Sequence, residues 1–130
     1  MSKSMRFLML TVLLISILLS ACTSKADAPA KSVEAFWRAM AATDGAALSS
    51  LSCADYEEEA LLTMESFQSV ELELKDLQCS TTGTSGDSAE VTCQGTLNAS
   101  YGAENFSFDL SDATFAAVKQ GGDWLMCGEK

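Results

Sequence analysis

The spacing of apolar residues changes once along this chain, from the period of a helix to the period of a strand. In the first part, apolar side chains recur at intervals of three and four residues, as in Val33, Phe36, Trp37 and Met40. This spacing places them on one face of a helix. We therefore predict three helices: from Pro29 or Ser32 to Thr43, from Ala46 to Leu51, and from Asp55 to Ser66 or Phe67.

Beyond Gln68 the apolar residues alternate with polar ones, which is typical of strands that are exposed to solvent on one face. The alternation slips near Lys75-Asp76, which indicates a bulge. A run of Ser, Thr and Gly at residues 80–88 predicts a hairpin loop, and Gln120-Gly121-Gly122-Asp123 predicts a turn. The predicted strands cover residues 70–79, 89–100, 106–110, 114–119 and 124–127.

Helices followed by a run of strands define an α+β fold class. We expect the N-terminal helices to pack on one face of a curved antiparallel sheet of four to five strands. The length of this region suits a single domain, which we place at residues 32–130.

The amino terminus has the pattern of an export signal. Lys3 and Arg6 precede an almost wholly apolar stretch at residues 7–19, which is shorter than a bilayer span requires. The stretch ends in Leu19-Ser20-Ala21-Cys22, which resembles the lipobox of bacterial lipoproteins. The alternative is an ordinary secretory signal, with Cys22 later in a disulfide.

The lipobox resemblance implies a signal peptide over residues 1–21, lipidation of Cys22, and a flexible tether over residues 22–31. Through this lipid the protein would be anchored to a membrane of the cell envelope, on the extracytoplasmic side. Thr23 stands where some bacteria place an aspartate that retains lipoproteins in the inner membrane. We therefore expect the outer membrane in a host with two membranes, and otherwise the outer face of the plasma membrane.

The cysteine count supports export. Without Cys22, the chain keeps Cys53, Cys79, Cys93 and Cys127, an even set that predicts two structural disulfides. Because two of them flank the predicted hairpin loop, the preferred pairing is Cys79 with Cys93 and Cys53 with Cys127, although four cysteines allow three connectivities. The sequence contains no CxxC motif, so we do not expect redox catalysis.

The charge of the chain limits its partners. From Cys22 onward, six basic residues face eighteen acidic ones, which gives a formal charge of −12. This charge repels phosphate backbones, so we exclude nucleic acid as a partner. The chain has no histidine, and the acidic run at residues 55–59 lacks the spacing of a calcium loop, so we expect neither a metal nor a cofactor.

Two segments resemble the nuclear-transport-factor-2-like superfamily, a group with a cystatin-like, cone-shaped α+β fold. Residues 33–40 (VEAFWRAM) followed by Asp44-Gly45 look like its opening helix, and residues 115–119 (FAAVK) followed by Gly121-Gly122-Asp123-Trp124 look like its last hairpin. The resemblance implies a helix entering the mouth of a curved sheet. This superfamily includes cyclase-like enzymes, dehydratases and isomerases as well as members without known catalysis, so the fold leaves the function open.

The large apolar side chains allow two interpretations, a ligand pocket or an ordinary packed core. The set consists of Phe36, Trp37, Met40, Phe106, Phe108, Phe115 and Trp124. Without histidine, catalysis would need a carboxylate base, for which Asp109 and Asp112 are the candidates, with Tyr101 nearby.

We therefore expect a non-catalytic binding or accessory domain that takes an unknown protein or a small apolar ligand. The alternative is a small enzyme of the isomerase, dehydratase or cyclase type.

Overall fold

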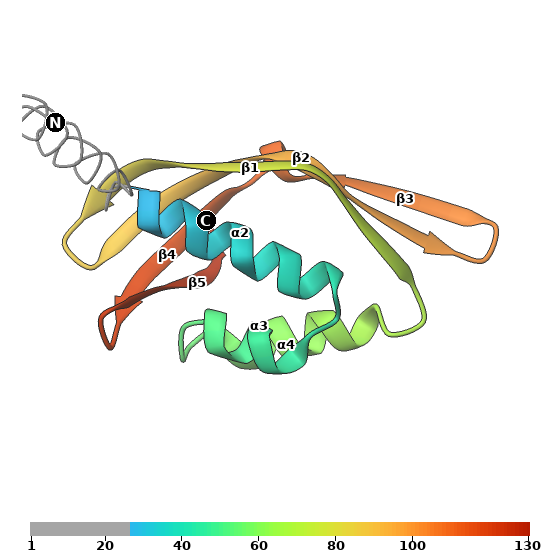
Figure 1. The fold of residues 1–130 in the computed structure, drawn as a ribbon, viewed down its shortest axis with the longest axis horizontal. Coiled ribbons are helices and arrows are strands. Elements are labelled where there is room, and N and C mark those ends of the chain that lie inside the picture. Colours follow the sequence, from blue (N-terminus) through green and yellow to red (C-terminus); the bar gives the residue numbers. More distant parts are fainter. Residues whose placement is uncertain (1–26) are drawn as a thin grey trace, which may run out of the picture.

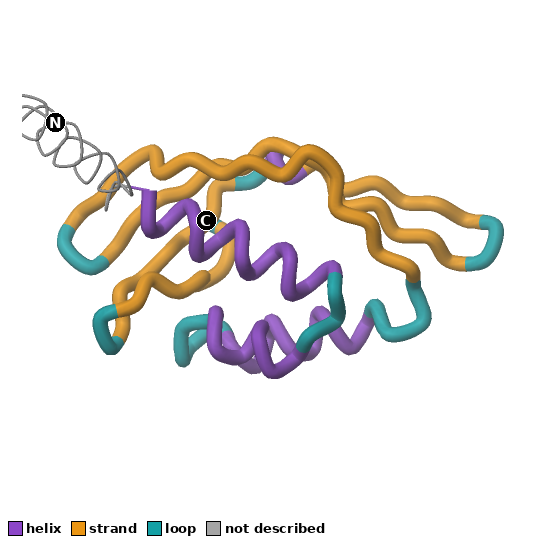
Figure 2. Tube along the Cα trace, in the orientation of Figure 1, coloured by secondary structure: helices purple, strands orange, loops and turns teal. Residues whose placement is uncertain are grey.

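The computed structural model of the protein describes residues 27–130. Three helices, α2 (Ala28–Ala41), α3 (Gly45–Leu51) and α4 (Glu57–Ser66), precede all the strands. The sheet contains β1 (Glu71–Ser85), β2 (Ser88–Tyr101), β3 (Glu104–Asp109), β4 (Thr114–Gln120) and β5 (Asp123–Glu129), with a short 3₁₀ turn η2 (Leu110–Asp112) between β3 and β4. The helices lie on one side of a bent sheet (Figures 1 and 2), which confirms the predicted α+β class.

β2 organises the sheet. β1 pairs with it along one edge, and β3 and β4 share the other edge, each covering about half of β2. β5 then pairs with β4, so the order is β1-β2-β4-β5, with β3 beside the far half of β2. All of these pairs are antiparallel, and the pairs β1–β2, β2–β3 and β4–β5 are hairpins with short connections.

The long β1–β2 hairpin is bent at the predicted bulge. The register shifts between Lys75 and Gln78, and Asp76 has a positive φ of 53°. On the opposing strand Gly95 has a φ of 115°, and a Cβ there would lie 2.6 Å from the Lys75 carbonyl oxygen. Only glycine combines this backbone conformation with such a close approach, so Gly95 allows the sheet to curve around the helices.

The core lies between α2 and the concave face of the sheet. Its largest fully buried side chains are Phe36 and Met40 from α2, Leu48 from α3, and Met126 from β5. The apolar side chains of α2 lie three and four residues apart, so they form one buried stripe, as the sequence predicted.

Helix α2 begins at Ala28, within one residue of the earlier of its two predicted starts, Pro29 and Ser32. Residues 28–31, which we expected in the tether, form the first turn of α2, and Pro29 and Ala30 are buried. Proline suits this position because its missing N–H would be unpaired there in any helix. The Ala30 N–H donates to Thr81 Oγ1 of β1 (3.2 Å), which fixes the start of the helix against the sheet. The signal peptide and Cys22 lie outside the described residues.

The expected loop at residues 80–88 is mostly strand. β1 continues to Ser85 and β2 starts at Ser88, so only Gly86 and Asp87 form the turn. Ser and Thr side chains are compatible with an exposed two-stranded ribbon, and backbone pairing along the ribbon overrides their preference for loops.

Both disulfides have the preferred pairing. Cys79 and Cys93 are direct cross-strand partners with Cα atoms 4.0 Å apart. Cys53, between α3 and α4, is bonded to Cys127 of β5, and the Cα atoms are 5.2 Å apart. A backbone hydrogen bond from the Cys53 N–H to the Met126 carbonyl oxygen (2.8 Å) lies beside this second bond. The helices and the last strand are thus joined both covalently and by hydrogen bonding.

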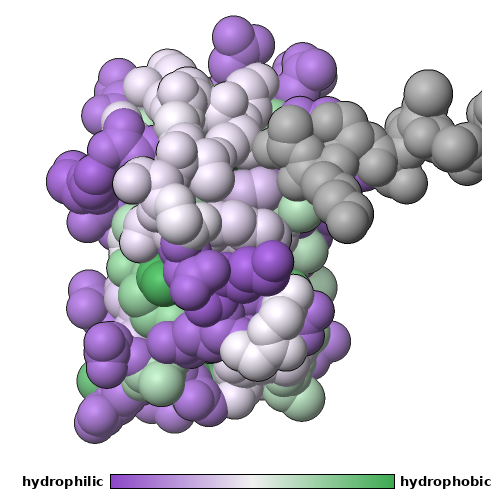
Figure 3. Space-filling model, turned by 90° about the vertical axis from the view of Figure 1, so that its left-hand side faces the viewer, coloured by the Kyte–Doolittle hydropathy of each residue, from purple (hydrophilic) through white to green (hydrophobic). Residues whose placement is uncertain are grey.

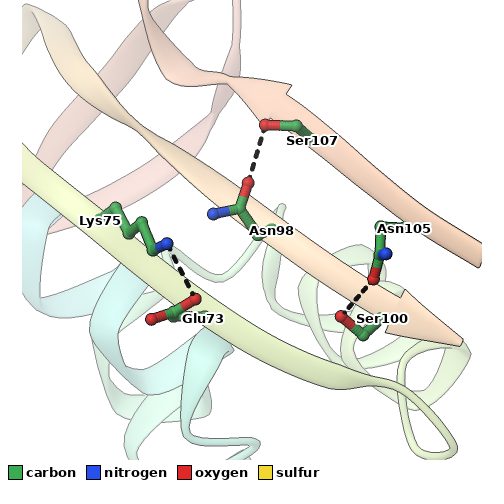
Figure 4. A network of polar contacts seen from close by, with 6 residues as sticks. All are labelled: Glu73, Lys75, Asn98, Ser100, Asn105 and Ser107. Carbon is green, nitrogen blue, oxygen red and sulfur yellow. Dashed lines mark hydrogen bonds and ion pairs between the residues drawn. The ribbon is translucent and has the colours of Figure 1, made fainter.

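The face of the sheet opposite the helices is polar around β3. Ser107 Oγ donates to Asn98 Oδ1, and Ser100 Oγ donates to Asn105 Oδ1, each over 2.8 Å (Figure 4). These pairs join β2 to β3. An ion pair between Lys75 and Glu73 of β1 lies next to them. The register of β3 is therefore set by polar pairs on the outer face and by apolar residues on the inner face.

Candidate functional site

A cleft of about 420 Å³ is bounded on one side by Trp37 of α2 and the C-terminal end of α4, and on the other by the junction of β3, η2 and β4. This volume is within the range of sites for small organic ligands. Its lining comes from α2, the end of α4, β2, β3, η2, β4 and β5: Trp37, Thr63, Phe67, Leu97, Ser107, Phe108, Asp109, Leu110, Asp112, Ala113, Phe115 and Glu129.

Aromatic rings form much of the wall of the cleft. The rings of Trp37 and Phe115 meet edge to face with centroids 5.5 Å apart, and Phe67 and Phe108 meet in the same manner at 6.4 Å. Phe115 is buried, Trp37 and Phe67 are half-buried, and Phe108 is 48% exposed. The cleft therefore has an apolar, aromatic floor and one aromatic side chain, Phe108, that is about half exposed to solvent.

The indole N–H of Trp37 is buried and has no hydrogen-bond partner among residues 27–130. The Phe36 ring lies at right angles to this indole with centroids 5.6 Å apart, and Phe115 packs on it as well. Trp37 is therefore held by ring packing rather than by a polar contact.

Three carboxylates, those of Asp109, Asp112 and Glu129, belong to the lining, which contains no Lys or Arg. Asp109 accepts hydrogen bonds from the Oγ (2.7 Å) and the backbone N–H (2.9 Å) of Ser111. These bonds, with the side-chain bond the stronger influence, lower the pKa of the Asp109 carboxyl below its usual value. Asp109 caps the η2 turn and is a weaker base than an ordinary aspartate.

The structure places the predicted pocket residues in three different environments. Trp37, Phe108 and Phe115 line the cleft, whereas Phe36 and Met40 are fully buried in the core. Trp124 is half-buried and packs against the core without lining the cleft.

Phe106, the last of the predicted pocket or core residues, neither lines the cleft nor joins the core, because its side chain is 53% exposed. Phe106 does lie on the concave face, opposite the buried Ala99 of β2, but no helix of the described region extends over this end of the sheet. Tyr101 is 58% exposed and is absent from the lining, so it does not join Asp109 and Asp112.

The sequence did not single out Phe67, Leu97 and Glu129 as lining residues. Phe67 lies at the end of the predicted third helix and Leu97 within a predicted strand, and each is at least partly buried on the inner face of its element. No pattern in the sequence could have shown that these faces border a cleft, because that depends on where α4 ends relative to β3.

The acidic run at residues 55–59 leads into the first turn of α4. Among the described residues, no group of three or more His, Cys, Asp or Glu side chains is placed so that it could hold a metal ion. Tyr56 packs on Phe36 there, with centroids 6.0 Å apart. Burial raises the pKa of the Tyr56 hydroxyl, and the charges of Glu59 and Glu129 raise it further.

Between residues 27 and 130 no helix is long and apolar enough to span a bilayer.

Comparison with known proteins identifies the fold but no close relative. No protein-family model matches the chain, and no curated protein sequence matches it. Among solved structures, a proposed dehydratase of the nuclear-transport-factor-2-like family from Streptomyces avermitilis aligns over 73% of this chain and 85% of its own, with 20% identity and a TM-score of 0.51.

Two further structures align over similar lengths. A proposed ketosteroid isomerase from Shewanella frigidimarina aligns over 78% of this chain and 93% of its own, with 18% identity and a TM-score of 0.53. A SEC-C motif containing protein from Rhodopseudomonas palustris aligns over 85% and 83%, with 15% identity and a TM-score of 0.54.

The chain therefore has the nuclear-transport-factor-2-like fold, a cone-shaped sheet with helices across its concave side, as the sequence resemblance implied. At these levels of identity the likeness establishes the fold alone. The activity has to be inferred from the cleft.

Proposed function

We propose that this protein is a membrane-anchored lipoprotein of the bacterial cell envelope whose domain binds a small, largely apolar ligand without transforming it. The lipid on Cys22 would hold the domain on the extracytoplasmic side, in the outer membrane where the host has two membranes. The two disulfides support an oxidising location.

The observation that carries the binding proposal is the cleft itself. It combines a buried and half-buried aromatic floor with an exposed aromatic side chain, Phe108, which a ligand would cover. Phe108 extends the apolar surface of the cleft, and continuous apolar surfaces of this kind mark ligand-binding grooves. The lining carboxylates and the absence of basic lining residues oppose an anionic ligand, so we expect a neutral or cationic one.

The environment of Asp109 favours binding over catalysis. A carboxylate base works best when burial raises its pKa toward neutrality. Hydrogen bonds from Ser111 instead lower the pKa of Asp109, and its carboxylate is exposed.

Ligand-detected NMR with three naphthalene compounds of the same shape tests the proposal: neutral 2-naphthylmethanol, cationic 2-naphthylmethylammonium and anionic 2-naphthoate. We expect the neutral and cationic probes to bind, and the anion to bind more weakly. Phe108→Ala should weaken binding by roughly tenfold, since a buried aromatic contact contributes about 1–2 kcal/mol. Phe106→Ala is the matched control because this exposed phenylalanine of the same strand lies outside the cleft.

Failure of all three probes to bind would refute the ligand proposal. Equal losses for Phe108→Ala and Phe106→Ala would show that the probes adhere to the exposed strand rather than occupy the cleft.

The anchoring proposal is tested by growing the host with an alkyne-labelled palmitate and fractionating its membranes. We expect the label on the wild-type chain and its loss in Cys22→Ser. A chain that keeps Cys22 unmodified and soluble would contradict the lipobox interpretation.

A carboxylate-dependent enzyme of the isomerase, dehydratase or cyclase type is the second candidate, because Asp112 lines the cleft together with Asp109. Exchange of the α-protons of 2-tetralone for deuterium, followed by NMR, measures such a base directly. Exchange catalysed by the wild-type protein and lost in Asp112→Asn would favour the enzyme, whereas exchange at the buffer rate would favour binding alone.

A further inference from the structure

β3 is the edge of the sheet with the least protection. It pairs with β2 on one side only, and within residues 27–130 no strand pairs with its other side. Tyr101 and Glu104 flank the two-residue turn of this hairpin, in which Gly102 has a φ of 58°. In such a hairpin these two residues bond to each other, so Glu104, Phe106 and Phe108 bond to β2. The backbone groups of Asn105, Ser107 and Asp109 consequently point outward.

The outer edge of β1, unlike that of β3, is partly covered by α2. Glu34 of α2 accepts a hydrogen bond from the outward N–H of Cys79 (2.8 Å), and the Thr81 hydroxyl accepts one from the first turn of the same helix. The remaining part of that edge carries the charged side chains of Glu71, Glu73 and Lys75. Coverage and charge are common means by which proteins prevent pairing at an edge.

β3 exposes aromatic side chains beside its open edge. Phe106 and Phe108 are 53% and 48% exposed on the concave face, and Tyr101, at the end of β2, is 58% exposed. This hairpin forms the end of the molecule opposite the start of α2 (Figure 1). Figure 3 faces the end where α2 starts, and there mainly hydrophilic and weakly polar residues are visible, with only scattered hydrophobic ones.

The charges around this edge select the partner. The segment from Tyr101 to Ala113 contains Glu104, Asp109 and Asp112 and no basic residue. Two copies paired through β3 would bring like charges together, in addition to the large negative charge of each chain, so a second copy is a poor occupant.

We propose that β3 is a docking edge for an extended segment of another protein, which adds a strand next to β3, covers Phe106 and Phe108 with apolar residues, and carries basic residues at its ends. Backbone hydrogen bonds to Asn105, Ser107 and Asp109 would give the affinity, as in other cases of strand addition. The apolar and basic side chains would give the specificity. This proposal does not depend on a ligand in the cleft.

The test uses the full chain in a neutral detergent and the capped peptide Lys-Val-Thr-Val-Thr-Val-Lys, followed by amide NMR. We expect shift changes and slower hydrogen exchange at the amides of Asn105 and Ser107. A peptide with glutamate in place of both lysines should bind at least roughly threefold more weakly, as expected for charges at an interface rim.

Ser107→Pro removes an outward N–H while leaving the bonds to β2 in place, since proline is tolerated on edge strands. It should weaken peptide binding by roughly tenfold, the effect of one lost hydrogen bond together with the misfit of the proline ring. Ser107→Ala is the matched control, because it also loses the hydroxyl bond to Asn98 but keeps the N–H. Its affinity should stay within about twofold of the wild type, since an exposed hydroxyl bond contributes little.

Equal binding by Ser107→Pro and Ser107→Ala, or equal binding of the lysine and glutamate peptides, would overturn the proposal. So would the absence of binding at millimolar peptide, or a dimer that protects the same amides without peptide. If Ser107→Pro fails to fold, the exchange rates of the Asn105 and Ser107 amides in the wild-type chain decide the question.

Discussion

The two disulfides should differ in their contribution to stability because they close loops of very different length. Cys53 and Cys127 are 74 residues apart, whereas Cys79 and Cys93 are 14 apart. In the chain-entropy model, the longer loop restricts the unfolded chain by about 4.5 kcal/mol and the shorter one by about 3 kcal/mol at 25 °C. We therefore expect the double variant Cys53→Ala/Cys127→Ala to lose about 1.5 kcal/mol more than Cys79→Ala/Cys93→Ala.

Urea unfolding followed by tryptophan fluorescence measures both losses, and the wild type with reductant serves as the reference for loss of both bonds. The slope of the unfolding free energy against urea should rise more in the Cys53/Cys127 variant, because its unfolded chain exposes more surface. A larger loss for the Cys79/Cys93 variant would refute the reasoning. It would mean that this bond mainly holds the bent hairpin in its native shape.

Three further predictions concern substitutions of single residues. Gly95→Ala should destabilise the protein in thermal unfolding by about 1–3 kcal/mol from its backbone conformation alone, and by more because its Cβ would meet the opposing carbonyl groups. Gly83→Ala is the control and should be nearly neutral, because there is open space around this residue. Equal losses of stability in the two variants would contradict the role of Gly95 in the bend. Tyr56 has a raised pKa in the folded state, so its stabilising contribution is complete below its unfolded pKa near 10 and is lost as the pH rises above that value. The urea midpoint of the wild type should therefore fall more steeply above pH 10 than that of Tyr56→Phe, and parallel curves would be evidence against burial of this hydroxyl. Glu34→Ala should cost about 1–2 kcal/mol in urea unfolding by removing the acceptor of the Cys79 N–H, while Glu34→Gln, which keeps an acceptor oxygen, should lose less than half of that.

The sequence predicted the elements well because their signals are local. Helix spacing marked α2 and α3 to within a few residues, and strand alternation located the bulge between Lys75 and Gln78. The sequence left the start of α2 open between Pro29 and Ser32, because Pro29 and Ala30 are small residues whose burial depends on contact with β1, more than forty residues away. Apolar residues at periodic positions carry their own signal, whereas small residues do not.

The candidate site was predicted only in part. Asp109, Asp112, Trp37, Phe108 and Phe115 do lie around one cleft. The same list contained residues of the core and of an exposed strand, because an aromatic side chain has the same sequence signature in all three places.

The sequence by itself determined the fold class, the even set of cysteines and the absence of a histidine base, because each of these follows from residue identity and short-range spacing. Only the tertiary structure decided which aromatic side chains border the cleft and which edge of the sheet stays open. The physical reason is that burial depends on what packs against a side chain. The helices cover one part of the sheet, whereas β3, all of whose residues are exposed, extends beyond them (Figure 1).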